Sequence, residues 1–138
     1  MALTIQSDTN VVTLVASYTP YDTLDELVEC LHALLTTGDA RRTVRVMEEP
    51  EVCELRFEHE NGTISLEVCR RFSHQHRRCH TLFEARGSVL EMCLPFWRAL
   101  RSLQTRFPEK DFELRWQRPF PASGMERLSA HLKSLRTQ

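Results

Sequence analysis

Residues 53–69 read CELRFEHENGTISLEVC, in which apolar and polar side chains alternate on both sides of an Asn-Gly pair. Asn-Gly favours a two-residue type I′ hairpin turn, because both central positions of that turn need positive φ. With this pair as the loop, Phe57 lies opposite Leu66 and Arg56 opposite Glu67, so apolar meets apolar and opposite charges meet. A slip of one residue would move every side chain to the other face. The sequence therefore predicts an antiparallel hairpin in this register.

The cysteines are odd in number and irregularly spaced, and the hairpin register places Cys53 and Cys69 on opposite faces, which argues against a disulfide between them. The first ten residues lack a basic segment followed by an apolar one, and no run approaches the ~18 apolar residues of a membrane span. We therefore expect a cytoplasmic protein with no membrane contact, whose free thiols are mostly small core residues. The cysteines are Cys30, Cys53, Cys69, Cys79 and Cys93.

The segments flanking the hairpin carry further strand and helix patterns. Residues 11–17 and 79–86 are β-branched or alternating and predict strands, as does the alternation at 44–48. Apolar residues at a 3.6-residue period predict a helix after the first strand and another that contains Pro95, which should kink or break it. A short helix is expected at 108–116 and a last one after it. Three capping boxes predict helix starts: Thr23 with Glu26, Ser88 with Glu91, and Ser123 with Glu126.

These elements define the expected fold class. The chain has 138 residues, of which 41% are hydrophobic and 27% charged, as in ordinary soluble domains. We expect a single α+β domain over residues 1–138, with an antiparallel sheet of about four to five strands. One helix should follow the first strand, and two to three C-terminal helices should pack on the sheet.

The net charge of −1 conceals two blocks of opposite sign. Residues 1–69 hold four arginines and thirteen acids, a net of −9, whereas residues 70–138 hold fourteen basic residues and six acids, a net of +8. Such asymmetry indicates an interaction surface. The alternative is that the two blocks meet on folding and neutralise each other within one chain.

The acidic strands and the basic segment after them are the candidate partner-binding surface. The outward glutamates of the hairpin would present a negative patch that suits a basic protein partner. Segregated charge could instead drive a salt-sensitive homodimer. The candidate partner-binding residues are Glu54, Glu58, Glu67, Arg70, Arg71, Arg77 and Arg78.

Residues 70–80, RRFSHQHRRCH, leave two other functions open. Imidazole and thiolate groups at short spacing can chelate a transition metal, and the candidate ligands are His74, His76, Cys79 and His80. The neighbouring arginines would repel a cation, so we expect no metal site and a solvated basic hairpin tip. The same arginines around Phe72 could contact nucleic acid, but one stacking residue and a net charge of −1 argue against it.

Motifs of the common enzyme classes are absent from the sequence. The four glycines are all used by the expected caps and turns, so no phosphate-binding loop remains. The patterns H-E-x-x-H, G-x-S-x-G and C-x-x-C are also missing. We therefore expect no catalytic residues and no cofactor.

Two stretches carry a resemblance to a known group of proteins. The run DFELRWQRPFP at 111–121, after LPFWRALRSLQTRF, is similar to the C-terminal part of small bacterial proteins of the immunity type, found beside polymorphic toxins. The helix opening YDTLDEL and the EEPE segment are similar too, and the pattern covers roughly two thirds of the chain, although RRFSHQHRRCH departs from it. The resemblance implies a stoichiometric, non-catalytic, protein-binding role without cofactor, and defines no functional residues.

Overall fold

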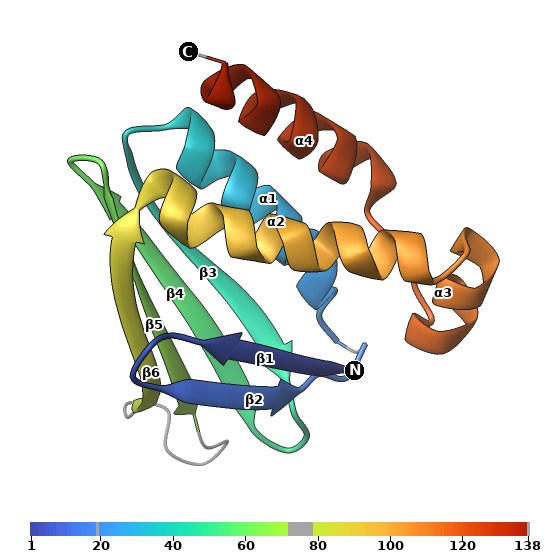
Figure 1. Ribbon diagram of the computed structural model, residues 1–138. Helices are drawn as coiled ribbons and strands as arrows, with labels where there is room; N and C mark the ends of the chain where they lie inside the picture. The colour runs from blue at the N-terminus through green and yellow to red at the C-terminus, as the bar shows by residue number, and fades with distance from the viewer. Residues whose placement is uncertain (19, 72–78, 138) are drawn as a thin grey trace.

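The structure is a computed structural model that describes residues 1–18, 20–71 and 79–137. The described elements are, in order, β1 (Ala2–Gln6), β2 (Val11–Val15), α1 (Thr23–Thr36), β3 (Asp39–Met47), β4 (Val52–Glu60), β5 (Thr63–Arg71), β6 (Cys79–Ser88), α2 (Val89–Arg106), α3 (Glu109–Trp116) and α4 (Ala122–Arg136). They confirm the α+β class. Strands β3 to β6 form an antiparallel sheet in chain order, and β1 pairs with β2 separately. Helices α1 and α2 and the β1–β2 hairpin lie on one side of that sheet, with α4 beside α1 (Figure 1).

The β4–β5 hairpin has the predicted register. Asn61 and Gly62 form the turn with φ values of 52° and 80°. Phe57 pairs with Leu66, and Arg56 pairs with Glu67. The prediction is confirmed, and the register also separates the sheet into two faces of different chemistry.

The face of the sheet under the helices, called here the inner face, is the floor of the core. Its buried side chains are Ala40, Val44, Val46, Cys53, Leu55, Phe57, Ile64, Leu66, Val68 and Phe83. Helix α1 contributes its leucine stripe to the same cluster, and Ile5 and Leu14 join it from the small hairpin. The apolar side chains that recur every 3.6 residues in α1 and those that alternate along the strands therefore form one buried cluster.

Strand β1 is an element that the sequence analysis did not predict. It pairs with β2 over its whole length, from Ala2 with Val15 to Gln6 with Val11. Only Leu3 and Ile5 of this strand face inward, so its own alternation is short. Pairing with the β-branched strand β2 completes a hairpin that neither segment would form alone.

Two of the three predicted capping boxes are wrong. Ser88 and Glu91 cap α2 reciprocally as predicted. Helix α1 is instead capped by Asp22, while Thr23 Oγ1 donates to the Arg45 carbonyl at 2.9 Å. The neighbouring Glu26 binds the Arg45 backbone and side chain rather than closing a box, because the unpaired edge of β3 competes for these groups.

Of the C-terminal helices, α2 packs on β5, β6 and α1, and α4 packs on α1. Helix α2 runs through the exposed Pro95 as one element, so the predicted break is absent. Helix α4 begins after Pro121 without a side-chain cap, which removes the third capping box. A Cβ on Gly124 would lie 2.9 Å from Val28 Cγ1, so glycine permits the close approach of α4 to α1. Among the described residues, no helix is both long and apolar enough to cross a membrane.

Candidate functional site

The face of the β3–β6 sheet that points away from the helices, called here the outer face, carries most of the candidate residues. Sheet pairing aligns its side chains in rows across the four strands. These rows are Arg41, Glu58, Ser65 and Arg86; Thr43, Arg56, Glu67 and Glu84; and Arg45, Glu54, Cys69 and Thr81. Because the strands alternate, these rows are mostly polar, whereas most side chains of the rows between them are buried, with Arg42 as an exposed exception.

The structure brings only part of the predicted partner-binding set together. Glu54, Glu58, Glu67 and Arg71 share the outer face. Arg70 pairs with Cys53 in the register and therefore lies on the inner face, at the end of the sheet. The other two candidate arginines, at positions 77 and 78, lie outside the described residues, as do the candidate metal ligands at 74 and 76.

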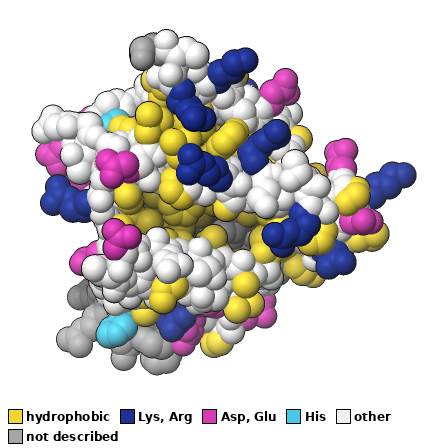
Figure 2. All heavy atoms as spheres, viewed as in Figure 1, with side chains coloured by type: hydrophobic (Ala, Val, Ile, Leu, Met, Phe, Trp, Pro, Cys, Tyr) yellow, Lys and Arg dark blue, Asp and Glu magenta, His cyan; other side chains and the backbone are white. Residues whose placement is uncertain are grey.

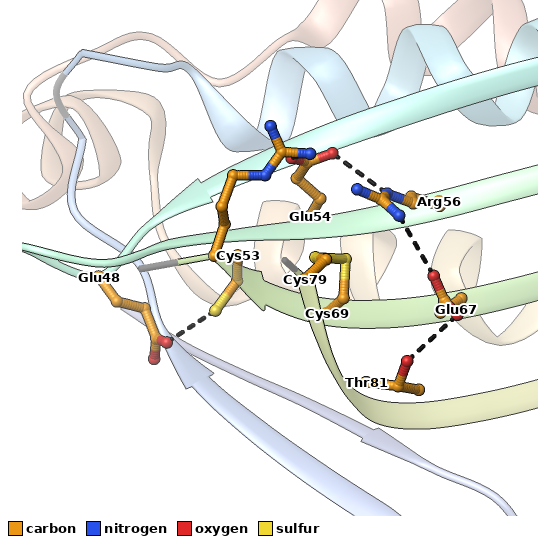
Figure 3. Close-up of a disulfide and its surroundings, with 9 residues drawn as sticks. Glu48, Cys53, Glu54, Arg56, Glu67, Cys69, Cys79 and Thr81 are labelled. Carbon is orange, nitrogen blue, oxygen red and sulfur yellow. Dashed lines mark hydrogen bonds and ion pairs between the residues drawn. A yellow bond between two sulfur atoms is a disulfide. The ribbon is translucent and has the colours of Figure 1, made fainter. Parts of the chain in front are cut away.

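The glutamates of the outer face are paired with arginines. Arg56 lies between two of them, 3.3 Å from Glu54 and 3.4 Å from Glu67. Glu54 also contacts Arg71 at 3.0 Å, while Glu58 contacts Arg41 at 3.1 Å. Figure 3 shows Arg56 pointing to both of its partners. The outer face is therefore a mosaic of both charges, and the uniformly negative patch that we predicted is not what the strands present.

The two charge blocks of the sequence meet within the chain. Among the described residues, all eight ion pairs take their acid from the first block, and four of them take their arginine from the second. Those four involve Arg70 twice, Arg71 and Arg127. Mutual neutralisation, which the sequence left as an alternative, therefore accounts for part of the asymmetry, through three of the fourteen basic residues of the second block.

One carboxylate of the outer face, that of Glu84, has no ion pair with a residue that the structure describes. Glu67 lies directly opposite Glu84 in the β5–β6 register, and like charges in such a pair repel each other. In the described part of the chain Glu84 has no ion pair, and Glu67 has only Arg56 and a hydrogen bond from Thr81 Oγ1 at 3.2 Å. A hollow of about 500 Å³ is lined by both of these glutamates and by Glu58, and its lining also includes the arginines Arg41, Arg42, Arg56 and Arg86. We call Glu67 and Glu84 the acidic pair.

A second polar cluster, centred on Glu48, lies at the end of the sheet where Arg70 occupies the inner face (Figure 3). Its carboxylate accepts hydrogen bonds from Val15 N, Cys53 Sγ and Arg70, each at 2.9 Å. Burial alone would raise the pKa of Glu48, but these three hydrogen bonds outweigh it and hold the pKa below its ordinary value. Arg70 also lies 2.9 Å from Glu51. The cluster ties the small hairpin to the main sheet, so Arg70 has a structural role here.

The cysteines divide into two kinds, and the prediction of free thiols is wrong for one pair. Cys69 and Cys79 form a disulfide between β5 and β6. Cys30, Cys53 and Cys93 are free and buried, as predicted. Burial raises the pKa of each of these thiols to about 12, so they are protonated and poor nucleophiles near neutral pH.

The disulfide bears on two other predictions. Cys79 cannot supply a thiolate to a metal while it is bonded to Cys69. His80, the remaining described candidate ligand, is exposed, and the residues that the structure describes contain no group of three metal-ligating side chains. A cytoplasmic location stays a prediction, and a disulfide argues against it because such bonds are rare in reducing compartments.

Sequence reasoning missed the Glu48 cluster and the acidic pair. The first joins residues that are 5 to 33 positions apart, and no local pattern links them. The second could have been found from the sequence, had the register been extended across β6 to place Glu84 opposite Glu67. We compared the chain with protein-family models, with curated proteins and with solved structures, and none of them matched.

Proposed function

We propose that this protein is a non-catalytic protein-binding module and that the outer face of the β3–β6 sheet is its contact surface. The observation that carries the proposal is the acidic pair in its 500 Å³ hollow, on a sheet face that the described helices leave open. The absence of catalytic sequence motifs and the resemblance to immunity-type proteins support a stoichiometric role without cofactor. The raised pKa of the free thiols also disfavours cysteine nucleophiles in the described chain.

The partner that suits this face presents a basic side chain. A Lys or Arg placed between Glu67 and Glu84 would relieve the repulsion of the two carboxylates and form charge-assisted hydrogen bonds with both. The surrounding arginines, Arg41 and Arg86, would favour acids at the edge of the same partner surface. Charge complementarity of this kind determines the orientation and the choice of the partner more than it determines the affinity.

The test is the affinity of charge-reversed variants for the partner that co-purifies with the tagged protein from its native host. We expect Glu67→Lys with Glu84→Lys to weaken binding more than about tenfold, which corresponds to ~1.4 kcal/mol. Reversal of exposed acids on the helical side, at Glu113 and Glu126, should leave the affinity unchanged.

The same ion pairs lead us to expect a monomer rather than the charge-driven homodimer. Four of the eight described ion pairs join the two charge blocks inside one chain, so part of the complementary charge is already used within the monomer. Light scattering should give the mass of one chain, 16.1 kDa, at both low and high salt. A dimer at low salt that dissociates at high salt would contradict this expectation.

A further inference from the structure

A hollow unrelated to the outer face lies where the start of β1 meets the end of α2 and α3. It measures about 380 Å³. Its lining includes Ala2, Leu103, Arg106, Phe107, Phe112, Arg115 and Trp116. A second hollow of about 270 Å³ shares Ala2, Leu103 and Arg106 with it and continues along α2 past Leu100 and Phe96. Figure 2 shows hydrophobic side chains gathered in a depression between α2 and the β1–β2 hairpin, with basic side chains above it and at its right end and acidic side chains at its left end.

Trp116 has a hydrogen-bond donor without an acceptor. The side chain is buried, with 3% exposed, and its Nε1 has no hydrogen-bond partner in the structure. The other tryptophan is satisfied, since Trp97 Nε1 donates to Ser129 Oγ at 2.8 Å. Because Trp116 Nε1 is out of reach of water in the structure, the indole ring lines the hollow as a reporter of binding and not as a donor to a ligand.

Two arginines give the same hollow a positive charge. Arg106 and Arg115 both line it, and neither forms an ion pair with any residue that the structure describes. The Arg115 guanidinium lies 4.9 Å from the centre of the Phe107 ring. The described lining includes no acidic side chain. The two guanidinium groups together favour an anionic acceptor.

The remaining walls are apolar, which restricts the kind of anion. Leu103, Phe107 and Phe112 surround the positive end, and the second hollow adds Leu24, Leu27 and Leu100. Ligand sites are typically ~300–1,000 Å³, mostly apolar, with a few polar groups that fix orientation. A fully hydrated anion such as inorganic phosphate would leave these apolar walls without a partner.

We propose that this hollow binds a small apolar carboxylate of the medium-chain fatty acid type. The carboxylate accepts from the guanidinium groups of Arg106 and Arg115, beside the Trp116 ring. The hydrocarbon chain runs along α2 over Leu103 and Leu100 into the second hollow. The site lies apart from the outer face, because the two sets of lining residues have no member in common.

The test uses decanoate, below its micellar concentration, and the two indole N–H signals of the full-length protein in a ¹H–¹⁵N NMR spectrum. Trp97→Phe and Trp116→Phe assign the signals. We expect decanoate to move the Trp116 signal saturably and to leave the Trp97 signal in place, because Trp116 lines the hollow and Trp97 lines neither hollow. Absence of a saturable shift, or an equal shift of both signals, would overturn the proposal.

Two comparisons distinguish a site for a carboxylate from a hydrophobic surface that binds any apolar chain. Decanol, which has the same chain and no charge, should bind at least about tenfold more weakly than decanoate. Arg106→Gln with Arg115→Gln should weaken decanoate binding by at least about tenfold, whereas Arg98→Gln, an exposed arginine of α2 outside the lining, should not. Equal affinity for decanol and decanoate, or full affinity in the double variant, would show that the charged groups do not form the site.

Discussion

Replacing Glu48 with alanine should lower the free energy of unfolding by about 2–3 kcal/mol. The variant leaves the Val15 N–H and the Cys53 thiol without their acceptor, and it leaves the Arg70 guanidinium with Glu51 alone. The Glu48 side chain is only 13% exposed, so water cannot readily replace these bonds. Urea unfolding followed by circular dichroism measures the change. Glu60→Ala, at an exposed carboxylate with no ion pair among the described residues, should cost less than about 0.5 kcal/mol.

The contribution of Glu48 should depend on pH in one direction. Its pKa is lower in the folded protein than the ordinary value of 4.5, so folding favours the charged carboxylate. The stabilisation is therefore fully present above pH 4.5 and is lost as the pH falls through the lower pKa of the folded state. The difference in stability between the native sequence and Glu48→Gln should shrink over that acidic range. A difference that is constant with pH would contradict the role assigned to the charge.

Removing the disulfide through Cys69→Ala with Cys79→Ala should lower the free energy of unfolding by about 2–3 kcal/mol under oxidising conditions, because the bond closes a loop with a sequence separation of 10. Thermal unfolding with and without reductant measures the effect. Reductant should lower the melting temperature of the native sequence and leave that of the double variant unchanged.

Counting thiols checks the pairing itself. Protein unfolded without reductant should show three reactive thiols, from Cys30, Cys53 and Cys93, and reduced unfolded protein should show five. Five reactive thiols in non-reduced protein purified under oxidising conditions would show that Cys69 and Cys79 do not pair.

The β4–β5 hairpin could be predicted because independent local signals coincide there. The alternation, the Asn-Gly turn and the matching of Arg56 with Glu67 all require one register, and the structure has it. The Ser88–Glu91 cap could be predicted for a similar reason, since both partners lie within one helical turn. Local chemistry was sufficient wherever the interacting groups are neighbours in the chain or are aligned by a tight turn.

The features that sequence reasoning missed depend on contacts between distant segments. Thr23 and Glu26 fit a capping box, but the unpaired edge of β3 binds both of them at Arg45, and Asp22 takes the cap. The β5–β6 register shifts by one residue after Val68, just before Cys69, which is bonded to Cys79. Counting residues from an assumed regular pairing does not reveal such a shift. The pairing of Glu58 with Arg41 and of Glu54 with Arg71 was missed because these arginines come from the strands on either side of β4.

The most direct test of the protein-binding proposal is a calorimetric titration of the co-purified partner with three proteins. These are the native sequence, the double variant Glu67→Lys with Glu84→Lys, and the matched control Glu113→Lys with Glu126→Lys, which has the same change in net charge. Circular dichroism first confirms that all three are folded. We expect the acidic-pair variant to bind more than about tenfold more weakly, and the control to bind as the native protein does. Equal affinity of all three proteins, or equal weakening by both double variants, would contradict a contact through the outer face.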